Sequence, residues 1–103
     1  MAYRLRYVQK FSPSDTETFM RLEKEFIRLE RETPGFPQGR RFTPVFSREP
    51  LNTLIWECDF PSLQEAVEAH LFLGDNVLHK QYYDEQLPCF VESHAEIYRS
   101  MES

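Results

Sequence analysis

The sequence predicts an α+β fold of the ferredoxin-like type, in which helices cover one face of a four-stranded antiparallel sheet. Three observations lead to this prediction. Segments with strand-like alternation and segments with helical spacing follow one another as strand, helix, strand, strand, helices and strand. Proline and glycine separate these segments. The chain has 103 residues, the size of one domain, which we place at 1–103.

The first strand and the first helix are predicted at the start of the chain. Residues 3–10 alternate in character, which is typical of a strand. Ser14 followed by Glu17 has the pattern of a capping box, so we expect a helix to begin there. This helix should run to about Thr33, because Pro34-Gly35 follows. Its apolar stripe consists of Phe19, Leu22, Phe26 and Leu29.

The second and third strands are expected in the middle of the chain. Residues 39–47 resemble a strand, but Pro44 cannot donate a hydrogen bond to a neighbouring strand, which indicates an edge position or a bulge. Residues 48–50 have the composition of a hairpin turn. Residues 52–60 form the clearest strand of the sequence. One face of it carries Leu54, Trp56, Cys58 and Phe60.

A second helical region follows the third strand. Ser62 and Glu65 form another capping box, and apolar residues then recur at helical spacing. We expect Gly74 to interrupt this helix and Asp75 to cap a further short one. The buried side of the short helix should carry Leu78 and Tyr82.

The last strand completes the predicted topology. Residues 90–99 alternate, and the usual strand order of the βαββαβ fold is then 4-1-3-2. In this order Cys58 and Cys89 lie roughly two strand spacings apart, about 10 Å. A disulfide needs Cα atoms within about 7 Å. We therefore expect both thiols to be free, as in a reducing compartment.

The composition argues against several classes of partner. A net charge of −5 disfavours affinity for nucleic acids and for anionic membranes. The chain contains no run of 18 apolar residues, so we expect no membrane span. Residues 39–42 are the nearest approach to an RNA-binding motif, and they lack its aromatic pattern. Residues 1–11 lack the apolar core of a signal peptide, and we expect a cytoplasmic protein.

The second face of the predicted sheet leads us to expect a homodimer. Helices cover only one face, and the other carries apolar groups such as Val8 and Ile55 among charged residues. So large a mixed face is seldom left exposed in a monomer. The core of such a short chain is also marginal. A two-fold dimer covers the open face with the same surface from both chains.

The whole pattern resembles the dimeric α/β-barrel superfamily, in which two ferredoxin-like sheets pack face to face. Residues 5–7 (LRY), residues 54–66 (LIWECDFPSLQEA), Asp75 and residues 97–98 (IY) resemble NIPSNAP-like proteins. Residues 66–70 (AVEAH) resemble the helix that carries the histidine of antibiotic-biosynthesis-monooxygenase-like proteins. The resemblance implies a homodimer, with no role established for the NIPSNAP-like group.

We expect no cofactor. Haem-degrading relatives of this superfamily use an asparagine on the first strand together with a tryptophan and a histidine on the helices. Residues 3–10 contain no asparagine, and the second helical region contains no tryptophan. The resemblance therefore does not extend to haem chemistry.

We also expect no metal site. Asp75 and His79 stand four residues apart on a helix, but two ligands do not make a site, and a surface pair or a cap explains them. A second group alternates along the last strand and consists of Glu92, His94 and Glu96. The strand order places this group beside Arg4 and Arg6, so cross-strand ion pairs account for it.

Three residues are the candidates for a ligand site. We expect a mainly apolar cavity between the sheet and the second helical region, because a break at Gly74 gives two short helices that pack less continuously than one. Trp56 would supply an aromatic wall and His70 a polar group. Tyr82 and Tyr83 are both candidates for the mouth, of which we assign Tyr82 to the site, since helix-to-sheet packing accounts for one of the two. The alternatives are a Trp56 that serves only the core and a His70 that is held by a backbone group or a carboxylate.

The function expected from these residues is the binding of a small apolar or aromatic molecule by a NIPSNAP-like homodimer. The alternative is a cofactor-independent monooxygenase or isomerase that acts on an aromatic molecule, with His70 taking a proton from the bound substrate. The sequence contains no nucleophile elbow, phosphate-binding loop or zinc-finger spacing.

Overall fold

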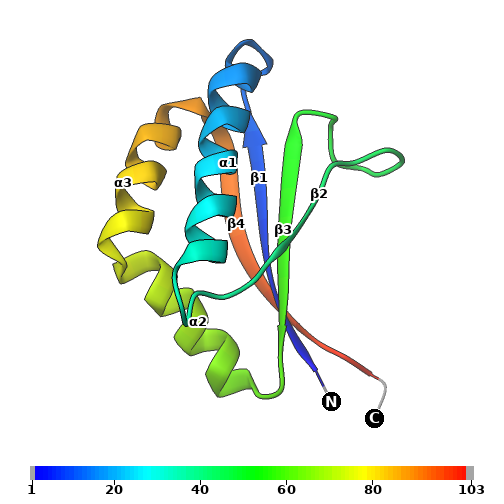
Figure 1. The fold of residues 1–103 in the computed structure, drawn as a ribbon. Helices are drawn as coiled ribbons and strands as arrows, with labels where there is room; N and C mark the ends of the chain where they lie inside the picture. Colours follow the sequence, from blue (N-terminus) through cyan, green and yellow to red (C-terminus); the bar gives the residue numbers. More distant parts are fainter. Residues whose placement is uncertain (1, 102–103) are drawn as a thin grey trace.

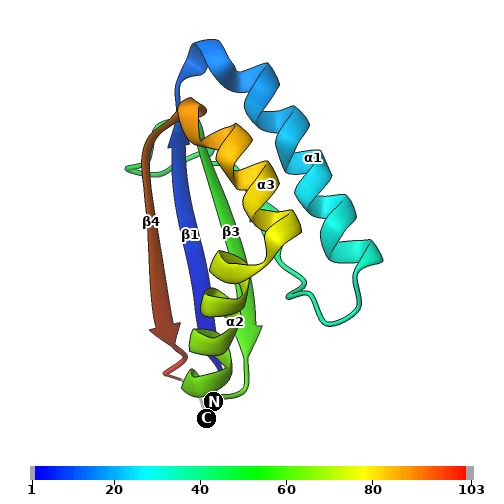
Figure 2. The ribbon, with the colours of Figure 1, turned by 90° about the vertical axis from the view of Figure 1, so that its left-hand side faces the viewer.

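In residues 2–101, the part of the chain that the computed structural model describes, four strands form one antiparallel sheet with three helices against one face (Figure 1). The elements are β1 Tyr3–Phe11, α1 Thr16–Glu32, β2 Arg40–Phe42, β3 Thr53–Phe60, α2 Leu63–Asp75, α3 Val77–Gln86 and β4 Phe90–Arg99. The strand order is β2-β3-β1-β4, which confirms the predicted ferredoxin-like topology. All three helices lie on the same side of the sheet (Figure 2).

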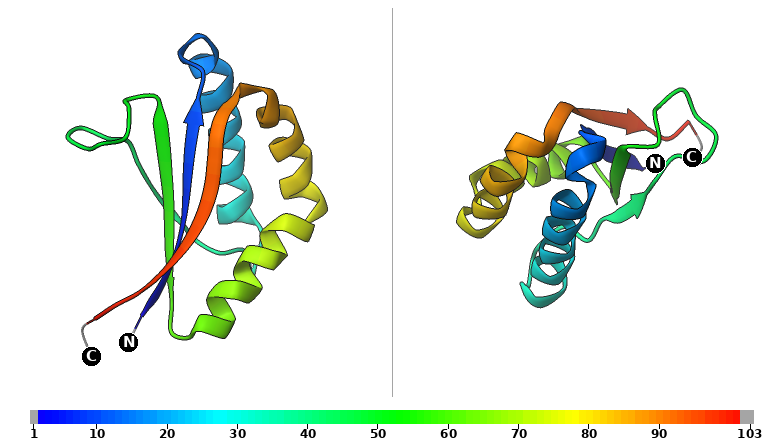
Figure 3. Two further views of the ribbon diagram at one scale, coloured as in Figure 1. Left: turned by 180° about the vertical axis from the view of Figure 1, so that it is seen from behind. Right: turned by 90° about the horizontal axis from the view of Figure 1, so that it is seen from above.

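The central strand β1 sets the register of the sheet. Tyr7 pairs with Trp56 on β3 and with Ala95 on β4, so these side chains share the face that the helices cover. Arg4 and Arg6 point to the opposite face. Seen from behind and from above, that second face has no helix over it in the described part of the chain (Figure 3).

Two clusters of buried side chains hold the helices against the sheet. The larger cluster contains Leu5, Leu29, Phe36, Trp56, Ala69 and Leu73. The smaller one contains Phe11, Phe19, Leu54 and Cys89. Phe11 and Phe19 stack with ring centroids 4.3 Å apart. The predicted apolar stripe of α1 and the predicted apolar face of β3 therefore both point into the core.

The two predicted capping boxes have different outcomes. Ser14 does not cap α1, because Pro13–Asp15 form a short 3-10 helix and α1 begins only at Thr16, without a side-chain cap. The prediction at Ser62 is confirmed: its hydroxyl accepts a hydrogen bond of 3.1 Å from the backbone N–H of Glu65. Pro13 restricts the backbone at the start of this 3-10 helix, so Ser14 lies inside it and not at the N-cap of α1.

The break in the second helical region lies two residues later than predicted. α2 continues through Gly74 to Asp75, so neither residue has its predicted role. Asn76 caps α3 instead, and its side chain accepts a hydrogen bond of 3.0 Å from the N–H of His79. Leu78 is 50% exposed, contrary to the prediction, because His79, the next residue along the helix, lies on the inward side.

The second strand is shorter than the 39–47 predicted. β2 contains only Arg40–Phe42, and residues 43–52 form a loop that projects beyond the sheet (Figure 1). Pro44 lies just after the strand, where a residue without an N–H ends the pairing. Phe46 in this loop is fully exposed.

The open face of the sheet carries cross-strand ion pairs, as predicted, although Arg4 and Arg6 do not pair with the predicted residues of the last strand. The pairs join Arg4 to Asp59 at 2.8 Å, Arg6 to Glu57 at 2.6 Å and Lys10 to Glu92 at 3.3 Å. Arg4 and Arg6 therefore pair with β3 rather than with β4. His94 lies 3.8 Å from both Glu92 and Glu96.

Two further findings bear on the sequence predictions. Cys58 and Cys89 are both free thiols. None of the helices within residues 2–101 is long and apolar enough to cross a membrane.

Candidate functional site

A cavity of about 400 Å³ lies between the sheet and the helices. All four strands contribute to one wall, and all three helices contribute the other. The aromatic side chains in its lining are Tyr7, Phe26, Trp56 and Tyr83. The volume falls within the range of small-molecule sites.

Trp56 forms a fixed part of the wall. Its indole is buried, and its ring centroid lies 5.2 Å from that of Tyr7. On the other side it packs directly against Gly39, since a Cβ at that position would lie 1.9 Å from the indole nitrogen. A backbone without a side chain is therefore needed beside Trp56.

Tyr7 and His70 form a hydrogen-bonded pair in the lining. The Tyr7 hydroxyl lies 2.8 Å from Nδ1 of His70. Burial raises the pKa of Tyr7, so its hydroxyl stays protonated at neutral pH. When that hydroxyl donates, Nε2 of His70 carries the ring proton. When Nδ1 donates, Nε2 has a free lone pair and is able to act as a base.

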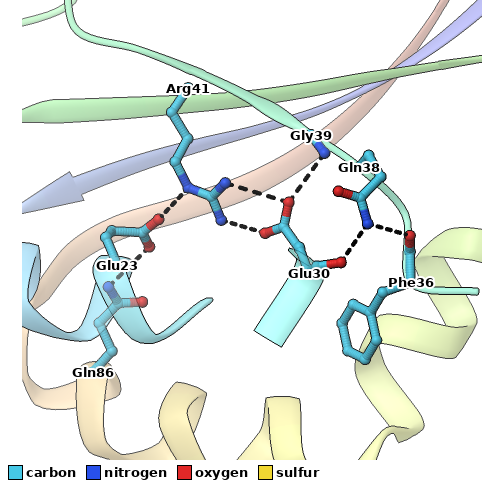
Figure 4. A network of polar contacts seen from close by, with 7 residues as sticks. All are labelled: Glu23, Glu30, Phe36, Gln38, Gly39, Arg41 and Gln86. Carbon is cyan, nitrogen blue, oxygen red and sulfur yellow. Dashed lines mark hydrogen bonds and ion pairs between the residues drawn. The ribbon is translucent and has the colours of Figure 1, made fainter. Parts of the chain in front are cut away.

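A network of charged and amide groups also lines the cavity (Figure 4). Arg41 on β2 donates from Nε to Glu23 at 2.7 Å, and its two terminal nitrogens bind both carboxylate oxygens of Glu30. The amide of Gln86 on α3 donates to Glu23 at 3.0 Å. The backbone N–H of Gly39 donates to Glu30 at 3.0 Å. A single guanidinium thus joins β2 to α1, and through Glu23 to α3.

The carboxylates of Glu23 and Glu30 keep Arg41 protonated. Burial on its own would lower the pKa of the guanidinium, but the hydrogen bonds and charges of Glu30 and Glu23 outweigh burial and raise that pKa. Arg41 is therefore a permanent cation, and its bidentate contact with Glu30 has the geometry of a strong ion pair.

His79 lies among aromatic rings near this network. Its imidazole packs 4.8 Å from the ring of Phe26 and 6.5 Å from that of Tyr83, centroid to centroid. Burial lowers the pKa of His79, the negative charge of Glu30 opposes this, and the positive charge of Arg41 adds to the lowering. The imidazole is therefore neutral at neutral pH.

The three predicted ligand residues are not all in the cavity. Trp56 and His70 both line it, whereas Tyr82 does not. The ring of Tyr82 packs edge-on against Phe26 of α1, 5.9 Å from centroid to centroid, and its hydroxyl accepts a hydrogen bond of 3.1 Å from Arg28. Tyr83, the next residue, lines the cavity instead. Among residues 2–101, no three metal-ligating side chains are grouped around a common point.

The sequence predictions missed the Arg41 network. One signal was available, because Glu23 and Glu30 stand one residue after Leu22 and Leu29 of the apolar stripe and are seven residues apart. Two carboxylates at that spacing lie on the same side of a helix. Nothing in the sequence around Arg41 marks it as their partner.

Comparison with known proteins identifies the fold. No family model matches the sequence, and no curated protein matches it. Among solved structures, the chain is similar to a NIPSNAP family protein from Agrobacterium tumefaciens, with a TM-score of 0.76, 14% identity and coverage of 99% of this chain and 95% of the other. A NIPSNAP-like domain protein from Burkholderia xenovorans matches with a TM-score of 0.77, 17% identity and coverage of 98% and 86%.

A second group of structures has the same architecture. An antibiotic biosynthesis monooxygenase matches with a TM-score of 0.71, 9% identity and coverage of 96% of this chain and 98% of the other. The chain shares the ferredoxin-like fold of these NIPSNAP and monooxygenase structures. This confirms the resemblance seen in the sequence. At such identities the NIPSNAP-like likeness concerns the fold, so the function must be argued from the site.

Proposed function

We propose that this NIPSNAP-like chain binds one small, mainly apolar or aromatic molecule in the cavity. The observation that carries the proposal is an open volume of about 400 Å³ with aromatic walls and a few polar groups in its lining. Such a site buries an apolar ligand and orients it through a small number of hydrogen bonds. The Tyr7–His70 pair and the Arg41 network are the polar groups available for this.

Native mass spectrometry of gently purified protein tests the proposal directly, because a tightly held molecule would travel with the chain. A titration with ethylnaphthalene gives a second readout, since Trp56 is the only tryptophan and its fluorescence reports on the cavity. Ala95→Phe on β4 should fill the cavity and abolish the response. Val91→Phe, four residues away on the same strand, exposed and outside the lining, is the control. An unchanged response in Ala95→Phe would contradict the proposal.

The His70→Ala variant tests the predicted orienting role of this residue. His70 is exposed and has few packing contacts to lose, so its removal should weaken the response to a ligand with little loss of stability. An affinity equal to that of the unmodified chain would mean that His70 does not take part in binding.

We further propose that the chain forms a homodimer through the open face of the sheet. That face presents apolar groups on each side of its ion pairs, including Phe42, Ile55 and Tyr98. Arg4, Arg6 and Lys10 on this face are already paired with carboxylates of the chain, so a second copy can cover them without burying an unpaired cation. A two-fold dimer would bury the same surface on both copies.

The mass of the protein in solution tests this arrangement. Analytical ultracentrifugation at micromolar concentration should give twice the mass of the chain, and Ile55→Asp should give the monomer. Leu71→Asp, at an exposed position of α2 on the helical side of the sheet, should leave the mass unchanged. A monomeric mass for the unmodified chain would contradict the dimer.

The Tyr7–His70 pair supports one alternative function, a cofactor-independent monooxygenase or isomerase that acts on an aromatic substrate. His70 would take a proton from the bound molecule in the tautomer in which Nδ1 donates to Tyr7. With an electron-rich phenol, the resulting phenolate would be the electron donor to molecular oxygen. Oxygen uptake by the unmodified chain and its loss in His70→Gln would favour this function. An absence of both uptake and isomerisation across a panel of phenols would exclude it.

A further inference from the structure

The Arg41 network has more negative than positive charge. The side chains of Glu23 and Glu30 are only 8% and 9% exposed, and Arg41 is the only cation paired with either of them within residues 2–101. Two buried carboxylates thus share one guanidinium, which leaves one negative charge without a partner. An unpaired buried charge is costly, and buried charges in proteins are normally compensated.

No other group in the described chain supplies the missing positive charge. His79 is close to the network, but the lowered pKa described above leaves it neutral. Lys80 also lines the cavity, but its side chain is exposed and is paired with Asp84 at 3.4 Å. A cation from outside this part of the chain would compensate the excess charge.

Gln86 gives independent evidence for a missing hydrogen-bond donor. This side chain is fully buried and lines the cavity, and its Oε1 has no partner among residues 2–101. Its amide nitrogen donates to the carbonyl of Phe19 at 3.3 Å and to Glu23 at 3.0 Å. A flipped amide would place the oxygen against these two acceptors, so the orientation is fixed. Oxygen Oε1 is thus a buried acceptor without a donor, on the same amide group that donates to Glu23.

The aromatic lining is a third feature that favours a cationic ligand. The faces of tyrosine, phenylalanine and tryptophan rings attract cations, and rings of all three types line this cavity. The same rings accommodate an apolar or aromatic body. A carboxylate or phosphate, in contrast, would add a negative charge to a cluster that already has one in excess.

We propose that the cavity takes a small organic amine in its ammonium form, with an aromatic or apolar body, whose N–H groups donate to Glu23 and to Oε1 of Gln86. This inference rests on the proposed ligand-binding function and specifies the chemical class of the ligand. An ammonium group neutralises the cluster and satisfies the free acceptor together. A neutral hydroxyl satisfies only the acceptor.

Three probes with the same aromatic body test the proposal near neutral pH: naphthylethylamine, ethylnaphthalene and naphthylacetate. The indole N–H resonance of Trp56 in nitrogen–proton correlation spectra reports binding of each. We expect the amine to bind at least about tenfold more tightly than ethylnaphthalene, and naphthylacetate to bind most weakly.

The Glu23→Gln variant identifies the group responsible. Its amide oxygen still accepts from Arg41, but the excess charge is gone and the Gln86 amide loses its acceptor on Glu23, so affinity for the amine should fall about tenfold while affinity for ethylnaphthalene stays the same. Glu32→Gln is the matched control, because Glu32 lies on the same helix, is 65% exposed and pairs with Arg28. It should leave all three affinities unchanged.

The outcomes separate this inference from the proposed function. Equal affinity for the three probes would overturn the preference for an amine and leave the ligand-binding proposal standing. A Trp56 resonance unmoved by every probe would overturn both. If Glu23→Gln does not fold, the order of affinities in the unmodified chain still decides.

Discussion

Arg41→Met removes the positive charge from the buried network and keeps most of the apolar stem. The variant loses the 2.7 Å hydrogen bond to Glu23 and both bonds to Glu30. Two nearly buried carboxylates then face each other without a cation. Removing one partner of a buried ion pair typically costs about 3–5 kcal/mol.

That cost is a large part of the stability of a small protein. Native chains have about 0.05–0.15 kcal/mol of stability per residue, which gives roughly 5–15 kcal/mol for this length. We expect Arg41→Met to lower the free energy of unfolding by about 3–5 kcal/mol. Adding Glu23→Gln and Glu30→Gln to Arg41→Met should recover most of this loss, because neutral amides leave no buried charge.

Urea unfolding followed by Trp56 fluorescence measures these differences, and pH supplies a second test. Buried carboxylates without a cation have raised pKa values, so the folded variant binds protons more readily than the unfolded chain. The difference in free energy of unfolding between the unmodified chain and Arg41→Met should therefore shrink as the pH falls from about 7 to about 5. A deficit below about 1 kcal/mol, or one that persists in the triple variant, would refute the assignment of the network as a buried, charge-coupled cluster.

Three further predictions follow from single contacts. In urea titrations, Gly39→Ala should lower the free energy of unfolding by about 1–3 kcal/mol, because its methyl group would overlap the indole of Trp56. Gly74→Ala has no atom within 4 Å of the new Cβ and should raise the free energy of unfolding by about 0.5–1 kcal/mol. Burial lowers the pKa of His79, so the unfolded chain takes up that proton first and stability is lost as the pH falls below about 6.5; His79→Phe should flatten this part of the stability–pH curve. Ser62→Ala should cost about 1 kcal/mol through loss of a helix cap, and Ser14→Ala should cost less than about 0.5 kcal/mol, a difference that calorimetry resolves. Equal costs for the two serines would contradict the observed start of α1.

The fold was predictable because its signals are local and repeated. Apolar spacing in α1 defines which side of the helix is buried, and alternation in β1 assigns Arg6 and Tyr7 to opposite faces of the sheet. Errors arose where two local signals compete. Pro13–Asp15 form a 3-10 helix at the position where Ser14 was expected to cap α1. In the second helical region, α2 continues past Gly74, and Asn76 caps α3.

The site was only partly predictable. Trp56 and His70 lie on consecutive elements that the topology packs together, so sequence reasoning placed both near one cavity. Of the two neighbouring tyrosines, the prediction assigned Tyr82 rather than Tyr83 to the site, and a one-residue change in helix phase turns a side chain by about 100°. The Arg41 network depends on contacts 11 to 63 residues apart along the chain, and α1 contains several other glutamates that look identical in sequence.

The Arg41 network also bears on how the molecule opens locally. β2 has only three paired residues at the edge of the sheet, a length that would normally fray and exchange its amide hydrogens rapidly. Its arginine is bound to α1, and α1 is bound to the last residue of α3 through Gln86. Release of β2 therefore exposes two carboxylates and loosens the end of α3 in the same event. The edge strand and that helix end form one cooperative opening unit, and their amides should exchange with a common, slow rate.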